Sequence, residues 1–182
     1  MASFDIAVEF VLLNEKGVEI NEADPGGITN RGISLRFLKA IDSDKLKLFG
    51  IFDKPNDETI KTLDIIQTKN IYYDQFWVHA PFEKLHSQEL CNYLFDSAVN
   101  MGIAPAVKAL QRACWSVFGC RSNHADDGIL GENTLYLVNS IRDMPALLCA
   151  LRSERAGDYR LIAALNPTEK QFLNGWLNRA YD

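Results

Sequence analysis

A carboxylate stands at the end of the first apolar stripe of the sequence. Apolar residues between Phe4 and Leu12 recur at the spacing of one helix face, and the next position on that face is Glu15. Partial burial disfavours the charged form of a carboxyl group and raises its pKa, which is what a general acid needs near neutral pH. Glu15 is therefore a candidate general acid. The helix could instead end before this residue, in which case the side chain faces water.

A second carboxylate and a hydroxyl follow in a glycine-rich segment. The run DPGGITNRGI contains Asp24 and Thr29. Two carboxylates at one cleft, with a hydroxyl that positions water, suit hydrolysis of a glycosidic bond. Because glycine lets the backbone approach a ligand closely, Gly26, Gly27 and Asn30 are candidate substrate contacts. Asp24 could instead serve only to start the turn before the proline that follows it.

Two pairs of residues with i, i+4 spacing are further candidates for saccharide contacts. Tyr73 and Trp77 could stack on the apolar faces of sugar rings, or pack in the core as part of an aromatic stripe. Asp96 and Asn100 lie on one face of their predicted helix. They could hydrogen-bond the substrate or hold a neighbouring loop.

The elements that position these residues are predicted to be helices. Residues 18–33 are rich in turn formers, which predicts a short hairpin or an ordered loop after the first helix. Ser34 is a predicted N-cap, and Asn166 with Glu169 is a predicted capping box for the last helix. The run 104–118 is apolar on most sides, which places it at the centre of a bundle. Further helices are predicted at 35–41, 58–68, 87–100, 133–142 and 145–158, so the fold class is mainly α.

The composition is that of a folded, acidic protein. A length of 182 residues allows one compact domain, or one with a small appendage. With 47% hydrophobic and 24% charged residues, the sequence is not that of a disordered chain. The formal net charge of −5 argues against a protein that binds duplex nucleic acid through a basic face.

The sequence carries no recognisable targeting or metal-binding pattern. The N-terminus lacks the basic flank of a secretory signal, and the apolar stretch 6–13 is too short to span a bilayer. We therefore expect synthesis in the cytoplasm and no stable membrane insertion. His79, His86 and His124 lack metal-ligand spacing. Buried free thiols are expected at the cysteines, Cys91, Cys114, Cys120 and Cys149.

Several blocks of the sequence resemble a known enzyme family. Glu15 and the DPGGITNRGI segment are similar to the N-terminal signature of the phage and prophage endolysins of glycoside hydrolase family 108, N-acetylmuramidases that are also known as secretion activator proteins. The family's Glu-Gly-Gly-Tyr pattern is altered here at Lys16 and Val18. The later blocks FDSAVNMG (95–102), DGILGENTL (127–135) and GWLNR (175–179) are similar to the peptidoglycan-binding segment usually fused to these enzymes.

The resemblance implies a lysozyme-like helical bundle. It places a muramidase-like segment at 1–94 and a peptidoglycan-binding segment at 95–182, packed together as one compact unit. It also implies cleavage of the β-1,4 bond between N-acetylmuramic acid and N-acetylglucosamine with inversion of configuration. Glu15 would protonate the leaving oxygen, while Asp24 and Thr29 orient and activate water on the opposite face. Neither a metal nor an organic cofactor is implied.

The implied partner is the glycan strand of peptidoglycan, not a nucleic acid. The enzyme would reach the cell wall after release from the cytoplasm, for example through a holin pore. A second interpretation stays open, in which the chain is a non-catalytic peptidoglycan-binding or secretion-accessory module.

Overall fold

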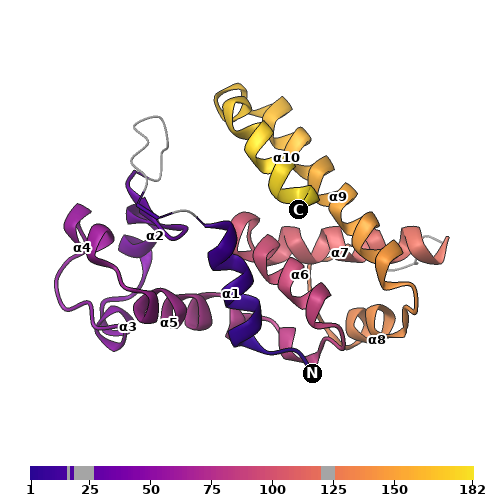
Figure 1. Ribbon diagram of the computed structural model, residues 1–182, viewed down its shortest axis with the longest axis horizontal. Coiled ribbons are helices and arrows are strands. Elements are labelled where there is room, and N and C mark those ends of the chain that lie inside the picture. Colours follow the sequence, from indigo (N-terminus) through magenta and orange to yellow (C-terminus); the bar gives the residue numbers. More distant parts are fainter. Residues whose placement is uncertain (16, 19–26, 120–125) are drawn as a thin grey trace.

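The computed structural model describes residues 1–15, 17–18, 27–119 and 126–182 of the chain. This part is mainly α, as the sequence predicts, with a small two-stranded sheet (Figure 1). No helix within these ranges is both long and apolar enough to cross a bilayer. Five residues named in the sequence analysis lie outside the described residues: Lys16, Asp24, Gly26, Cys120 and His124.

The elements of the described residues are mostly helices. In chain order they are α1 (Phe4–Asn14), β1 (Thr29–Asn30), β2 (Ile33–Ser34), α2 (Leu35–Ala40), α3 (Ser43–Leu48), α4 (Asp57–Thr62), α5 (Ile65–Gln75), the 3-10 helices η1 (Trp77–His79) and η2 (Phe82–Lys84), α6 (Gln88–Met101), α7 (Ile103–Phe118), α8 (Glu132–Ser140), α9 (Met144–Leu165), the 3-10 helix η3 (Pro167–Phe172) and α10 (Leu173–Tyr181).

The region between the first two helices contains a β-hairpin, which confirms one of the two predictions made for it. β1 and β2 pair antiparallel, with Asn30 opposite Ile33. The turn residues Arg31 and Gly32 have φ values of +47° and +77°, and two left-handed residues at the turn are typical of a tight hairpin. Ser34 then caps α2 as predicted, because its hydroxyl accepts a hydrogen bond from the backbone N–H three residues later over 3.1 Å.

The segment predicted as one helix over 58–68 is two helices, α4 and α5. The first ends at Thr62, and Asp64 starts the second with a capping box of its own. The Asp64 carboxylate accepts from the Gln67 backbone N–H over 2.8 Å, and the Gln67 side chain accepts from the Asp64 N–H over 3.0 Å. The single-helix prediction is therefore wrong. The short helix α3 was also not predicted.

Helix α7 lies at the centre of the molecule, packed against both α6 and α9. Val107, Leu110 and Cys114 on this helix are fully buried, which confirms the predicted central position. Burial raises the pKa of the Cys114 thiol to about 12, and burial likewise raises that of Cys91 on α6 to about 12. Cys149 is exposed, so the expectation of a buried thiol is wrong there, because this residue lies on the solvent-facing side of α9.

Shortening the Leu110 side chain provides a test of the central role of α7. Leu110 has no exposed surface, so Leu110→Ala removes packed methyl groups and leaves a cavity. We expect a loss of about 2–5 kcal/mol in the free energy of unfolding, measured by denaturant melts. Leu13, which is 84% exposed, offers a control, because Leu13→Ala should change stability little. A loss at Leu110 as small as that at Leu13 would place α7 at the periphery.

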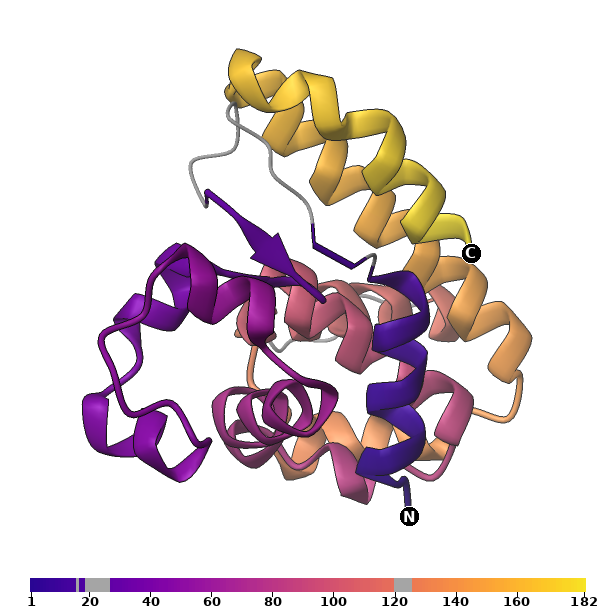
Figure 2. The ribbon, with the colours of Figure 1, turned by 60° about the vertical axis from the view of Figure 1, so that its left-hand side comes forward.

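The chain ends in a hairpin of two helices, α9 and α10, which lie side by side in both ribbon views (Figures 1 and 2). α9 extends well beyond its predicted end at residue 158. The capping box predicted at Asn166 is wrong. The chain continues as η3, so the Glu169 N–H bonds to the backbone carbonyl of Asn166 over 2.9 Å instead of to its side chain.

Candidate active site

Glu15 closes the C-terminal end of α1. Its backbone N–H donates to the Val11 carbonyl over 3.0 Å, and its own backbone is extended, with φ −92° and ψ 124°. The helix therefore remains ordered up to this residue. The side chain is only 15% exposed, so it does not simply face water.

An arginine from the other end of the chain pairs with this carboxylate. Arg179 on α10 places Nη2 2.6 Å from Glu15 Oε1. Its guanidinium also donates two hydrogen bonds to Asp96 on α6, from Nη2 over 2.8 Å and from Nε over 3.1 Å. Burial by itself lowers the pKa of Arg179, but the bonds to Asp96 and the charges of Asp96 and Glu15 outweigh it, so the net shift is upward. Arg179 is thus a fixed cation shared by two carboxylates. In Figure 2 the C-terminal end of α10 lies near the C-terminal end of α1.

Asp96 lies beneath Arg179 and is fully buried. Besides Arg179, its carboxylate faces the guanidinium of Arg155 on α9 at 2.9 Å and accepts a hydrogen bond from the Asn14 amide over 3.3 Å. Because cations and an amide surround Asp96 on all these sides, its carboxylate is not exposed to a substrate. The structure therefore places Asp96 as a support for Arg179.

Arg155 connects Asp96 to the second member of the predicted pair, Asn100. The Arg155 side chain has no exposed surface and lies over the rings of Tyr93 and Tyr159. Its Nε donates to the Tyr159 hydroxyl over 2.9 Å, and that hydroxyl donates to Asn100 Oδ1 over 2.5 Å. Asp96 and Asn100 thus share one helix face, as predicted, and both contact the C-terminal hairpin.

Glu15 also packs against the β-hairpin and α5. A Cβ atom built on Gly32 would lie 2.7 Å from Glu15 Cδ, 2.8 Å from Glu15 Oε2 and 2.5 Å from the Tyr72 hydroxyl. That hydroxyl donates to the Arg31 carbonyl over 2.7 Å. Burial, with a further contribution from the negative charge of Glu15, raises the pKa of Tyr72. Only a glycine at position 32 lets the turn, the carboxylate and the phenol lie this close together.

A comparison of two glycines with nearly the same φ distinguishes the steric contact at Gly32 from backbone strain. Gly32 and Gly27 have φ values of +77° and +76°, but a Cβ at Gly27 meets no atom within 4 Å. We expect Gly27→Ala to cost about 1 kcal/mol through its left-handed backbone alone. Gly32→Ala should destabilise the protein further and disturb Glu15. Equal melting temperatures for the two variants would show that the close contact at Gly32 has no energetic effect.

The remaining residues of the glycine-rich segment have different positions. Gly27 has a left-handed φ, which glycine adopts without steric cost. Thr29 is half-buried at the start of β1. Asn30 is buried, and its amide donates to the carbonyls of Ile60 and Leu63 over 2.8 and 3.3 Å. The Asn30 side chain thus anchors the hairpin to the end of α4.

Tyr73 and Trp77 are not brought to Glu15. Both rings pack edge-on against Phe4, with centroids 5.0 and 5.3 Å away. Phe4 begins α1, whereas Glu15 follows its last residue, so roughly 16 Å of helix separates them. Trp77 is 7% exposed and Tyr73 47%, and both line a surface cavity of about 440 Å³. Core packing accounts for Trp77, and only Tyr73 presents much of its ring to solvent.

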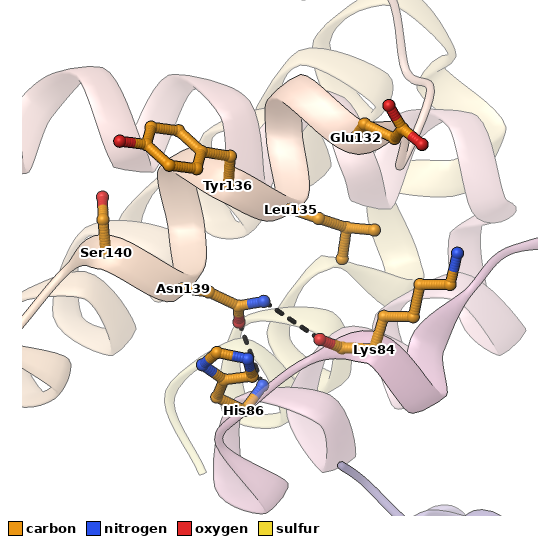
Figure 3. Close-up of a pocket in the computed structure, with 7 residues that line it drawn as sticks. All are labelled: Lys84, His86, Glu132, Leu135, Tyr136, Asn139 and Ser140. Carbon is orange, nitrogen blue, oxygen red and sulfur yellow. Dashed lines mark hydrogen bonds between the residues drawn. The ribbon is translucent and has the colours of Figure 1, made fainter.

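A second cavity, of about 490 Å³, lies between α8 and the segment after η2 (Figure 3). Asn139 fixes its floor: the amide donates to the Lys84 carbonyl over 3.0 Å, and its oxygen accepts from the His86 N–H over 3.0 Å. Tyr136 is 81% exposed at the rim. Because the Ala2 N–H bonds to the Glu83 carbonyl, this cavity lies near the start of α1, away from Glu15.

The DGILGENTL block forms a loop and the first turn of α8, and Gln111 on α7 binds both parts. The Gln111 side-chain amide donates to Asp127 over 2.7 Å and to the Thr134 hydroxyl over 3.0 Å, and the Gln111 side-chain oxygen accepts from the Gly128 N–H. The bond from Gln111, followed by that from the Ile129 N–H, lowers the pKa of Asp127. This block therefore connects the start of α8 to α7.

Sequence reasoning missed two described residues that lie near the Glu15 carboxylate, Tyr72 and Arg179. Arg179 stands in the closing GWLNR block, but its distance of more than 160 residues from Glu15 hides the pairing. Tyr72 is the residue before Tyr73. The Tyr73 ring packs on Phe4 at the start of α1, whereas the Tyr72 hydroxyl lies near Gly32 and Glu15 at the C-terminal end of that helix. Among the described residues, no group of three or more His, Cys, Asp or Glu could hold a metal ion.

Comparisons with known proteins identify the family and the fold. Residues 8–102 match the family model described as glycosyl hydrolase 108, and residues 105–181 match the model described as a predicted peptidoglycan domain. No curated protein sequence matches the chain significantly. The solved structure of Brucella abortus SagA has the same fold, with a TM-score of 0.65 and 24% sequence identity over 98% of this chain and 93% of that one. Since the first family model spans more than half of the chain, the protein belongs to the glycosyl hydrolase 108 family.

Proposed function

We propose that the protein is an N-acetylmuramidase that hydrolyses the β-1,4 bond between N-acetylmuramic acid and N-acetylglucosamine in peptidoglycan, with Glu15 as the general acid. The observation that carries the proposal is the placement of Glu15. It is a carboxylate at the junction of α1, the hairpin and α10, only 15% exposed, within the segment that matches a glycosidase family. Enclosure of this kind keeps bulk water from the group that must transfer a proton.

The second half of the reaction is assigned to the glycine-rich segment. Asp24 would act as the base and the Thr29 hydroxyl would help orient the attacking water, giving inversion of configuration. In an inverting enzyme the two carboxyl groups stand about 6.5–9.5 Å apart, which leaves room for that water. This is the separation we expect between Glu15 and Asp24. Thr29 supports the assignment because it lies in β1, on the hairpin that contacts Glu15 through Gly32.

Two substitutions of Thr29 test the role of its hydroxyl. Thr29→Ser keeps the hydroxyl, so turnover should fall only slightly. Thr29→Val keeps the volume but removes the group that holds water, and we expect turnover to fall on the order of 10²-fold. Murein turbidity assays provide the rates, and thermal melts show whether both variants fold. Equal rates for the serine and valine variants would exclude a catalytic role for the hydroxyl.

A second candidate function is peptidoglycan binding without cleavage. It is favoured by the open cavity at α8, which lies apart from Glu15 and carries the exposed ring of Tyr136 at its rim (Figure 3). An exposed tyrosine can stack on the apolar face of a sugar.

A murein gel and a murein pull-down, run in parallel, separate the two functions. A muramidase clears the gel and sediments with intact sacculi. A binding module sediments with sacculi but leaves the gel opaque. Tyr136→Ala should weaken sedimentation without slowing hydrolysis of soluble glycan fragments if the α8 cavity contacts the wall.

A further inference from the structure

We propose that Arg179, at the C-terminal end of the chain, is a positioning residue of the glycosidase site. In this view the segment that matches a peptidoglycan domain completes the active site in addition to any contact it makes with the wall. The inference rests on the proposed function of Glu15.

The geometry around Glu15 indicates which carboxylate oxygen is fixed. Oε1 lies 2.6 Å from Arg179 Nη2, and Oε2 faces Gly32. An oxygen that accepts from a guanidinium cannot carry the acidic proton at the same time. Arg179 therefore fixes the rotamer of Glu15 and leaves Oε2 as the oxygen that can hold and donate the proton.

Arg179 is oriented by a second carboxylate. Its guanidinium donates to both oxygens of Asp96, and Asp96 also pairs with the fully buried Arg155. A bidentate pair of this kind sets orientation as well as charge. Two cations and two anions alternate along this row, from Glu15 through Arg179 and Asp96 to Arg155, so the buried charges balance.

The docking of α10 does not depend on the contact with Glu15. The Tyr93 hydroxyl on α6 donates to the Ala180 carbonyl over 2.6 Å, next to Arg179 in the chain. Trp176 stacks on Tyr159 of α9 with ring centroids 5.3 Å apart, and Ala180 is fully buried. Since these contacts already place the helix, the bond from Arg179 to Glu15 serves the carboxylate.

The test is the kinetics of Arg179→Met and Arg179→Lys beside the wild type, with Arg160→Ala as control, because Arg160 is an exposed arginine of the same hairpin. We expect the methionine variant to lose kcat on the order of 10²-fold at unchanged KM, through misplacement of the acid. The lysine variant keeps the charge but not the fork, so its kcat should fall less. If the methionine variant does not fold, a fall in kcat of the lysine variant at unchanged KM would support the proposal.

Wild-type kcat in the variant that folds would overturn the proposal, and so would increased activity, which would make Arg179 an inhibitory cover. A double-mutant cycle of Glu15→Ala and Arg179→Met, in which each change removes one of the two paired groups, reports the pairing through thermal melts and without activity. We expect the two changes to be non-additive, whereas additivity would contradict the pairing. Coupling in the melts together with an inactive wild-type enzyme would mean that the proposed function had failed while the pairing stood.

Discussion

Glu15→Gln should yield a folded protein whose murein hydrolysis is about 10²- to 10⁴-fold slower than that of the wild type. Protonation of the leaving oxygen by a positioned acid contributes an acceleration of this size, and glutamine has no proton to donate at neutral pH. The fold should persist because the amide oxygen can still accept from Arg179, 2.6 Å away in the native protein. Sedimentation with sacculi should therefore be retained.

Glu89→Gln is the matched control for this variant. Glu89 is an exposed glutamate in the first turn of α6, so the rate of murein hydrolysis by its variant should equal that of the wild type. Substantial hydrolysis by Glu15→Gln would mean that another carboxylate is the acid. Asp96 does not qualify as that carboxylate, since its side chain is 1% exposed and is surrounded by Arg155 and Arg179.

Asp96→Asn should destabilise the protein by about 3–5 kcal/mol, the largest loss of stability expected for a single substitution in this network. The change keeps the shape of the side chain but leaves Arg155 and Arg179 without their shared counter-charge. Arg155 is fully buried, so its cation cannot recover solvation. Denaturant melts provide the free energy of unfolding.

Asp44→Asn is the comparison for Asp96. Asp44 pairs with Lys47 on the surface, where its side chain is 84% exposed, and such pairs contribute at most about 1 kcal/mol. Similar losses for the two variants would show that the buried row of charges contributes no more than a surface ion pair. We expect the losses in free energy of unfolding to differ by more than about 2 kcal/mol.

The helical periodicity of the sequence predicts most of the fold, because burial of one apolar face determines where those helices lie. The central helix α7 and the cap at Ser34 follow from residues within one or two turns of each other. The break at Asp64 was missed, because its capping box with Gln67 competes with a helical pattern that continues through it. At Asn166 the error was opposite: residues with capping preferences precede a 3-10 turn that bonds through the backbone.

The candidate site shows where sequence reasoning stops. The stripe from Phe4 places Glu15 toward the interior, and it lies there. The stripe does not predict that Glu15 pairs with Arg179, because this pairing depends on how α10 packs on α6 through Tyr93 and Ala180. Asp96 and Asn100 were correctly placed on one face, but only the packing of α9 shows that their partners are Arg155 and Tyr159.

The reducing ends of the fragments released from purified murein test the central claim most directly. If the protein is a muramidase that cleaves between N-acetylmuramic acid and N-acetylglucosamine, mass spectrometry after borohydride reduction should find reduced N-acetylmuramic acid at the new ends. These ends should be absent from a parallel digest with Glu15→Gln. Fragments ending in reduced N-acetylglucosamine, or murein that stays intact while the folded wild-type protein binds it, would contradict the account.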